Sequence, residues 1–226
     1  MKKRIIFSVL CGLLCFGFLF YGCSNNVLAL SQSRVSDIRS NYFQGQTDEW
    51  YVSFSSGLRE SPYVLDGVCE NTVEFGVVTI MSKTSKNETS LTYTVSINDL
   101  EYSGEFEASP FDDSYAGDIC TKVNDTDVIF ITISDGGSSE IANMTCASCD
   151  FTITAEQALE LAVDEVETDL KDMCGSEGFE VYVKIVADIT QAISDKYWFV
   201  MFLCESGDTI SVLINPATGE CEIKKV

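Results

Sequence analysis

The sequence predicts a mainly β protein with an α+β C-terminal part. Residues about 35–149 alternate apolar and polar side chains over short stretches, which is typical of half-buried strands. From about residue 150 to 174, apolar residues instead recur every three or four positions, which is typical of a helix. Because this change of period is sharp, we expect two folded domains, at 35–149 and 150–226.

The first domain is expected to be an antiparallel β-sandwich. The stretch SLTYTVSIND (90–99) alternates strictly, and EWYVSFSSG (49–57), NTVEFGVVTIMSKT (71–84), GEFEAS (104–109) and DVIFITISDGG (127–137) also read as strands. Turn signals such as Ser-Gly, Asp-Gly and Gly-Gly separate them. The number of strands favours an immunoglobulin-like arrangement, although the Cys-Trp-Cys pattern of antibody domains is absent.

The second domain is expected to be one helix packed on an antiparallel sheet. A helix begins after Thr154, which forms a capping box with Gln157, and ends at Gly175. Strands follow in FEVYVKIVAD (179–188), KYWFVMFLC (196–204), TISVLIN (209–215) and CEIKK (221–225). The NPATG turn before the last strand uses Pro216 to fix φ and Gly219 to supply a positive φ.

The order of these elements resembles the PepSY family. The resemblance lies in TAEQALELA, which opens the helix, and in the hairpin YWFVMFLCESGDTISVLINPATGE. The resemblance implies an envelope or secreted protein. Modules of this family have been proposed to restrain proteases. The family pattern contains no catalytic residues, so we assign none. Modules of this family also occur in the propeptides of thermolysin-type peptidases. This chain contains no HExxH motif of such a peptidase, so we expect no propeptide role in cis.

The N-terminal stretch MKKRIIFSVLCGLLCFGFLFYGC has a basic start followed by an apolar run, as in a secretory signal. Its end, FYGC, resembles the lipobox of bacterial lipoproteins. The resemblance implies a signal peptide at 1–22, a diacylglyceryl anchor on Cys23 (palmitate or a similar acyl chain), and a polar tether at 23–34. We therefore expect a lipid-anchored protein on the extracytoplasmic face of the cell membrane. Cleavage after Ala29 and an uncleaved anchor remain alternatives.

Charge and composition exclude several functions. The chain carries 14 basic and 35 acidic residues and no histidine, for a net charge of −21. Such a surface repels nucleic-acid backbones, so we expect no nucleic-acid partner. Without histidine, Ser-His-Asp catalysis and histidine-ligated metal sites are excluded, and we assign no cofactor.

Seven cysteines follow Cys23, at positions 69, 120, 146, 149, 174, 204 and 221, so at least one thiol stays unpaired within the chain. The similar stretches SPYVLDGVC (61–69) and SPFDDSYAGDIC (109–120) suggest a disulfide between Cys69 and Cys120. Cys146 and Cys149 form the single CxxC, read either as a redox pair or as a local disulfide. Cys204 is expected to be a small core residue.

The charged loops FDDSYAGD (111–118) and NDTD (124–127) are expected to be solvated, since they lack the spacing of a calcium-binding EF-hand loop. The expected function is non-enzymatic binding of an unknown extracellular protein or envelope polymer, including protease modulation. Two alternatives remain open: an envelope hydrolase that uses a pair of carboxylates, and a thiol redox sensor at Cys146 and Cys149.

Overall fold

A computed structural model describes residues 24–84, 90–174, 178–190 and 195–225 of the chain. It shows a mainly β protein with two helices in the described part, which confirms the expected mainly β and α+β character. Residues 1–22, expected to be a signal peptide, and Cys23 lie outside the described residues.

The elements of the N-terminal part are one helix and ten strands. In chain order they are α2 (Ser24–Gln32), β1 (Val35–Gln46), β2 (Trp50–Glu60), β3 (Thr72–Ser82), β4 (Thr92–Ile97), β5 (Leu100–Glu105), β6 (Glu107–Ala108), β7 (Ser114–Ile119), β8 (Ile129–Ser134), β9 (Ser139–Asn143) and β10 (Thr145–Cys146). The C-terminal part comprises α3 (Ala155–Cys174), β11 (Phe179–Ala187), β12 (Lys196–Cys204), β13 (Thr209–Ile214) and β14 (Cys221–Lys225).

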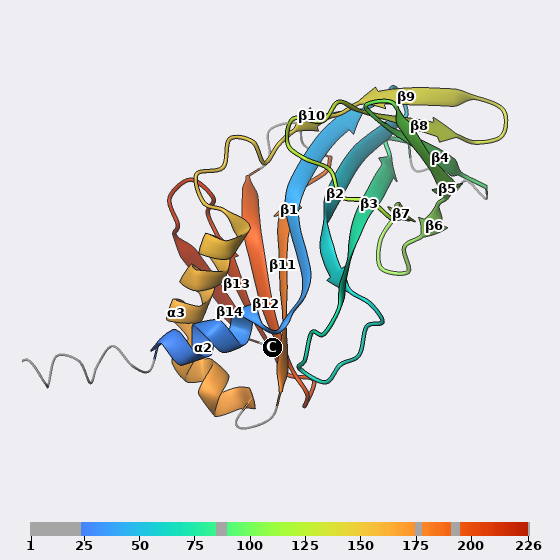
Figure 1. Cartoon of the computed structure of the whole chain (residues 1–226). Coiled ribbons are helices and arrows are strands. Elements are labelled where there is room, and N and C mark those ends of the chain that lie inside the picture. The colour runs from blue at the N-terminus through green and yellow to red at the C-terminus, as the bar shows by residue number, and fades with distance from the viewer. Residues whose placement is uncertain (1–23, 85–89, 175–177, 191–194, 226) are drawn as a thin grey trace, which may run out of the picture.

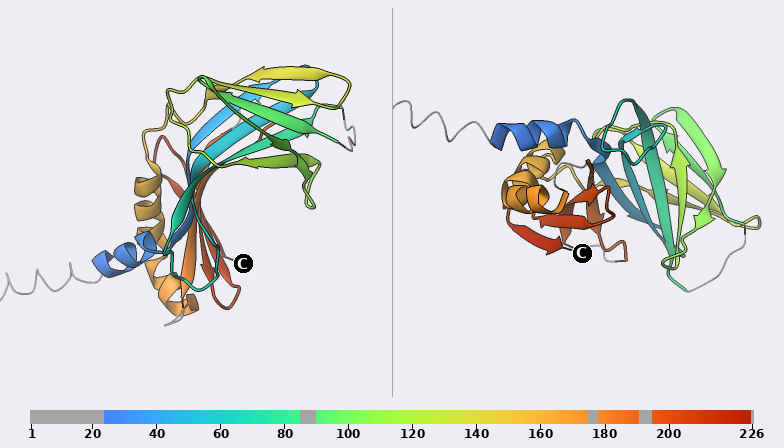
Figure 2. Two further views of the ribbon diagram at one scale, coloured as in Figure 1. Left: turned by 45° about the vertical axis from the view of Figure 1, so that its right-hand side comes forward. Right: turned by 90° about the horizontal axis from the view of Figure 1, so that it is seen from below.

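One ten-stranded sheet runs through both parts of the chain. Its order is β14-β13-β12-β11-β1-β2-β3-β7-β6, and β10 pairs with β1 beside this path. β1 and β11 form the one parallel pair among the described strands. A second sheet of four strands has the order β5-β4-β8-β9. The long strands bend, so that the small sheet faces one end of the large sheet and α3 packs at the other end (Figures 1 and 2).

The N-terminal core fills the space between the two sheets. Its members alternate along β2, β4 and β8, as the sequence pattern predicts. Fully or almost fully buried members are Phe43, Val52, Phe54, Val78, Ile80, Val95, Ile129 and Ile131. This two-sheet packing agrees with the expected sandwich at the coarse level.

The C-terminal core lies between α3 and strands β11 to β13. α3 buries one face of its 20 residues, including Ala158, Ala162 and Val166, against Val183 and Val200. The predicted capping box is present: Gln157 N donates to Thr154 Oγ1, and Thr154 N donates to Gln157 Oε1. Gly219 has the predicted positive φ, at 77°. The chain therefore builds two cores along one continuous sheet.

Residues 24–32, expected to belong to a polar tether, form helix α2 instead. Val27 and Leu28 pack against the C-terminal core, and Ser31 is fully buried. Helix α2 contacts α3 and β11. The sequence SNNVLALSQ has little apolar periodicity, so tertiary packing rather than helix propensity stabilises this helix.

Candidate functional site

The CxxC segment is attached to β1 by backbone hydrogen bonds. Cys146, at the end of β10, lies opposite Phe43 in the large sheet. The Ala147 and Ser148 amides both donate to the carbonyl oxygen of Tyr42, at 2.8 and 3.2 Å. The buried Ser148 hydroxyl in turn accepts from the Tyr42 amide. The sheet thus fixes the position of Cys146.

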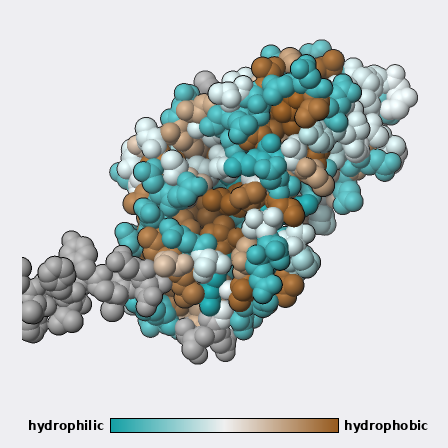
Figure 3. Space-filling model, viewed as in Figure 1, coloured by the Kyte–Doolittle hydropathy of each residue, from teal (hydrophilic) through white to brown (hydrophobic). Residues whose placement is uncertain are grey.

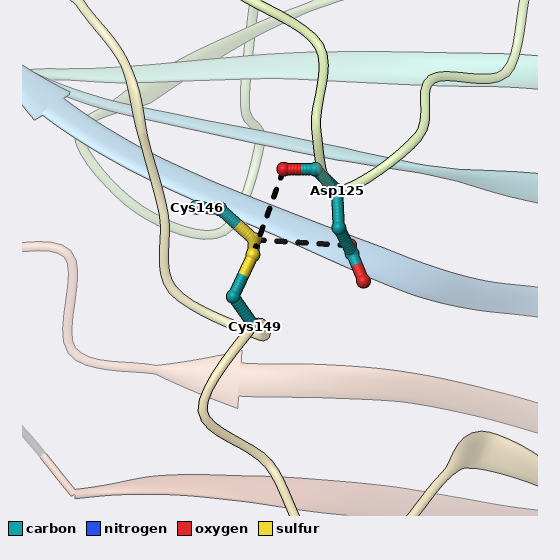
Figure 4. Close-up of side chains that lie close together, drawn as sticks. All are labelled: Asp125, Cys146 and Cys149. Atoms are coloured by element: carbon teal, nitrogen blue, oxygen red, sulfur yellow. Dashed lines mark hydrogen bonds between the residues drawn. A yellow bond between two sulfur atoms is a disulfide. The ribbon is translucent and has the colours of Figure 1, made fainter.

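Cys146 and Cys149 form a disulfide, and Asp125 lies against it (Figure 4). The Cys146 Sγ is 3.7 Å from Asp125 Oδ1, and the Cys149 Sγ is 3.6 Å from the Asp125 carbonyl oxygen. Disulfide sulfurs carry no proton, so these are contacts in the oxidised form. After reduction, each thiol has an acceptor within reach.

The Asp125 side chain comes from the loop between β7 and β8 and is oriented by β1. Asn41 Nδ2 donates to Asp125 Oδ1 at 2.7 Å, and the Ser40 hydroxyl donates to Asn41 Oδ1 at 2.9 Å. Asn41 is 8% exposed, so this support is largely buried. Three separate segments, around residues 41, 125 and 147, therefore meet at the disulfide.

The disulfide borders a cavity that we call the junction cavity. Its volume is ≈ 430 Å³, and the two parts of the chain both line it. The N-terminal part contributes Ser40, Asn41 and Asp125, while Phe151, Thr154 and Trp198 come from the C-terminal part. Cys149 is exposed, so an incoming thiol has access to its sulfur.

The surroundings of the disulfide differ from those of a helix-activated CxxC pair. Helix α3 begins at Ala155, six residues after Cys149, so neither cysteine belongs to its first turn. The Asp125 carboxylate lies 3.7 Å from the Cys146 sulfur and disfavours a second negative charge beside it. The arrangement can undergo thiol–disulfide exchange, and after reduction the carboxylate can accept a hydrogen bond from the Cys146 thiol.

The remaining cysteines differ from the expected pairing. The proposed Cys69–Cys120 disulfide is corrected: both residues are free thiols. In the β3–β7 pair, Gly76 lies opposite Ile119, so Cys120 comes next to Phe75. Cys69 instead lies on the loop before β3, six residues before Phe75. A disulfide needs the two Cα atoms within about 7 Å.

Cys204 is buried in the core, as expected, but it also forms a disulfide with Cys174. This bond connects the last residue of α3 to the end of β12. Cys221 is the third free cysteine of the described residues.

A pair of buried acids lies elsewhere, at the end of β2 and on β11. Glu180 is 1% exposed and Glu60 is 7% exposed. Glu180 accepts from the Tyr182 hydroxyl at 2.8 Å and from the Asp66 amide at 3.2 Å. Burial raises the pKa of the Glu60 carboxyl, and the negative charges of Glu180 and Asp66 raise it further. Neither acid lines the junction cavity.

A second hollow, which we call the apolar groove, lies between the helices and the large sheet. It has a volume of ≈ 500 Å³, and Val35, Ile38, Leu58, Cys69 and Leu159 contribute to its lining. Figure 3 shows apolar surface on this face, beside β1. Exposed apolar side chains continue on the loop before β3, at Tyr63, Val64, Leu65 and Val68.

Comparisons of the chain with protein-family models, with curated proteins and with solved structures found no match. Among the helices that the structure describes, none combines the length and the apolar character needed to cross a membrane.

The sequence pointed to Cys146 and Cys149 but not to their neighbour. Asp125 appears in the sequence only as one acid of the loop NDTD, about 20 positions away from Cys146. No local pattern links the two, because their contact depends on how β10 pairs with β1. The structure therefore adds a third chemically competent side chain to the pair.

Proposed function

We propose that this chain is a non-enzymatic binding protein of the bacterial cell surface, and that the redox state of the Cys146–Cys149 disulfide controls its binding. The observation that carries this proposal is the position of the disulfide. It is exposed at Cys149 and borders a cavity that both parts of the chain line. Opening the disulfide releases the Cys149 side chain from Cys146, and so changes the lining of that cavity.

The proposed location is the extracytoplasmic face of the membrane, with a diacylglyceryl anchor on Cys23. The start of α2 at Ser24 supports a short connection between anchor and folded body, because α2 packs on α3. The large negative charge keeps the body from adhering to anionic headgroups, so the acyl chains supply the membrane affinity.

At a finer level, we propose that the C-terminal part is PepSY-like and the N-terminal part immunoglobulin-like. The order of helix α3 and four antiparallel strands supports the first assignment. Two sheets packed around one core support the second. The partner would then be an extracellular protein or envelope polymer, including a protease that the chain restrains.

Capture of partners from the host envelope tests this function. The bait is residues 24–226, because a bait without α2 would lose part of the C-terminal core. The oxidised bait and a Cys146→Ser/Cys149→Ser bait are compared, with a Cys120→Ser bait as the matched control at a free thiol. We expect a component retained by only one of the first two baits, and the same result for oxidised and control baits. The same set of captured components on all three baits would contradict redox control.

A further inference from the structure

We propose that the reduced thiols of Cys146 and Cys149, together with the Asp125 carboxylate, form a binding site for Zn²⁺. The inference rests on the proposed function, since it requires the disulfide to open in the folded protein. A lone CxxC supplies two ligands, which is too few for a stable zinc site. Asp125 supplies the third.

The distances fit tetrahedral coordination. The ligand atoms of all three residues lie within 4.8 Å of one another. With a Zn–S bond of about 2.3 Å and a Zn–O bond of about 2.1 Å, a tetrahedron separates sulfur from oxygen by about 3.6 Å. The Cys146 Sγ and Asp125 Oδ1 are 3.7 Å apart. The two sulfurs then need to separate to about 3.8 Å, which breaking the S–S bond permits.

Two of the three ligands are held in place before any metal arrives. β10 pairing fixes Cys146, and the hydrogen bond from Asn41 fixes the Asp125 carboxylate. Hydrogen bonds of this kind, to a ligand rather than to the metal, orient the ligand and raise its affinity. Cys149 is exposed and lies beyond the strand, so it is the ligand that moves.

The chemistry proceeds in two balanced steps. A dithiol donor transfers two electrons and two protons: the S–S bond breaks, each cysteine becomes a thiol, and the donor becomes a disulfide. Zn²⁺ then forms bonds to both sulfurs and to one Asp125 oxygen, and the two thiol protons go to solvent. The neighbouring cavity leaves room for a water molecule as the fourth ligand.

The site is consequently a metal site that oxidation closes. In the disulfide, neither sulfur is a thiolate, so the oxidised protein lacks two of the three ligands. The net charge of −21 raises the local concentration of cations around the protein. We infer that reduction loads the site with Zn²⁺ and that oxidation releases it.

The test uses residues 24–226, which contain both cores, in a Cys69→Ser/Cys120→Ser/Cys221→Ser background that removes the other free thiols. The protein is treated with a phosphine reductant, its thiols are counted, and its fold is checked by circular dichroism. Zn²⁺ binding is then measured by competition with a chromophoric chelator. Co²⁺ serves as a second probe, since thiolate ligands give a charge-transfer band.

We expect one Zn²⁺ per reduced chain and none per oxidised chain. Asp125→Asn should lower the affinity at least about tenfold, and Cys149→Ser should abolish the thiolate-to-cobalt band. Asp150→Asn, which removes the same charge from an exposed neighbour of Cys149, should leave the affinity unchanged.

Two results would overturn the proposal, and they are distinguishable. If two new thiols appear in the folded protein but no Zn²⁺ binds, or if Asp125→Asn and Asp150→Asn behave alike, the metal site is wrong while redox control stands. If no thiol appears until the protein unfolds, both the metal site and the proposed function fail.

Discussion

Ile38 on β1 lies opposite Val183 on β11, in the parallel pair that connects the two halves of the large sheet. Val183 is fully buried in the C-terminal core, and β1 continues from this pair to Phe43 in the N-terminal core. The two cores therefore share a strand, which couples their stabilities.

We predict that the two cores unfold together. Each contains one of the chain's two tryptophans: Trp50 lies in the N-terminal core and Trp198 in the C-terminal core. Single-tryptophan variants, Trp50→Phe and Trp198→Phe, report on each core by fluorescence during urea unfolding. In both variants, Val183→Ala should lower the unfolding free energy by about 2 kcal/mol. If Val183→Ala lowers the unfolding free energy reported by Trp198 but not that reported by Trp50, the cores unfold separately.

Gly57 on β2 tolerates no side chain. It lies across from the irregularity in β1 between Ile38 and Asn41, and an added Cβ would collide with the backbone carbonyl oxygen of Ile38. We expect Gly57→Ala to destabilise the protein by about 1–3 kcal/mol or more, because the neighbour is backbone and cannot rotate away.

Gly137→Ala is the control for this substitution, since its nearest contact is the Asp135 side chain at an ordinary 3.7 Å. Urea unfolding should give nearly wild-type stability for the control. Equal losses for both variants would show that the close approach to β1 does not constrain Gly57.

The raised pKa of Glu60 makes stability depend on pH. Between the ordinary glutamate pKa of about 4.3 and the raised pKa, the folded state holds more protons than the unfolded state. Stability should therefore fall as pH rises through that window. Glu60→Gln should be more stable than wild type at neutral pH, and the difference should shrink on acidification.

Thermal unfolding of Glu60→Gln as a function of pH measures this effect, with Glu101→Gln as the control because Glu101 is exposed on β5. An unchanged pH profile for Glu60→Gln would show that the buried carboxyl does not titrate as described.

The sequence predicted several elements from local patterns, but it indicated no strand at 35–46, where β1 lies. Alternation predicted β4 and β8, and the capping box placed the start of α3 correctly at Ala155. The parallel pairing of β1 with β11 was not predictable. These strands are separated by more than 100 residues, and no local pattern determines which strands become neighbours.

The candidate site was predictable in part for the same reason. The spacing of Cys146 and Cys149 allows a local disulfide whatever the fold. The position of Asp125, and the absence of a Cys69–Cys120 bond, follow from strand register, which the resemblance between the loops 61–69 and 109–120 does not determine.

The two disulfides should contribute differently to stability. The Cys174–Cys204 bond closes a loop with a sequence separation of 30, and removing it should cost about 3–4 kcal/mol in the chain-entropy model. The Cys146–Cys149 bond has a separation of 3, which gives only about 1.6 kcal/mol in the same model. Urea unfolding of Cys174→Ala/Cys204→Ala and Cys146→Ser/Cys149→Ser should show this order. The reverse order would mean that the CxxC bond is structural.

The most direct test is a redox titration of the folded chain, residues 24–226, in mixtures of a reduced and an oxidised dithiol. After alkylation, peptide mass spectrometry measures the reduced fraction of each disulfide. We predict that Cys146–Cys149 opens and closes reversibly while the protein stays folded, and that the buried Cys174–Cys204 bond stays intact. Joint reduction of both bonds, accompanied by unfolding, would contradict a redox-controlled surface protein.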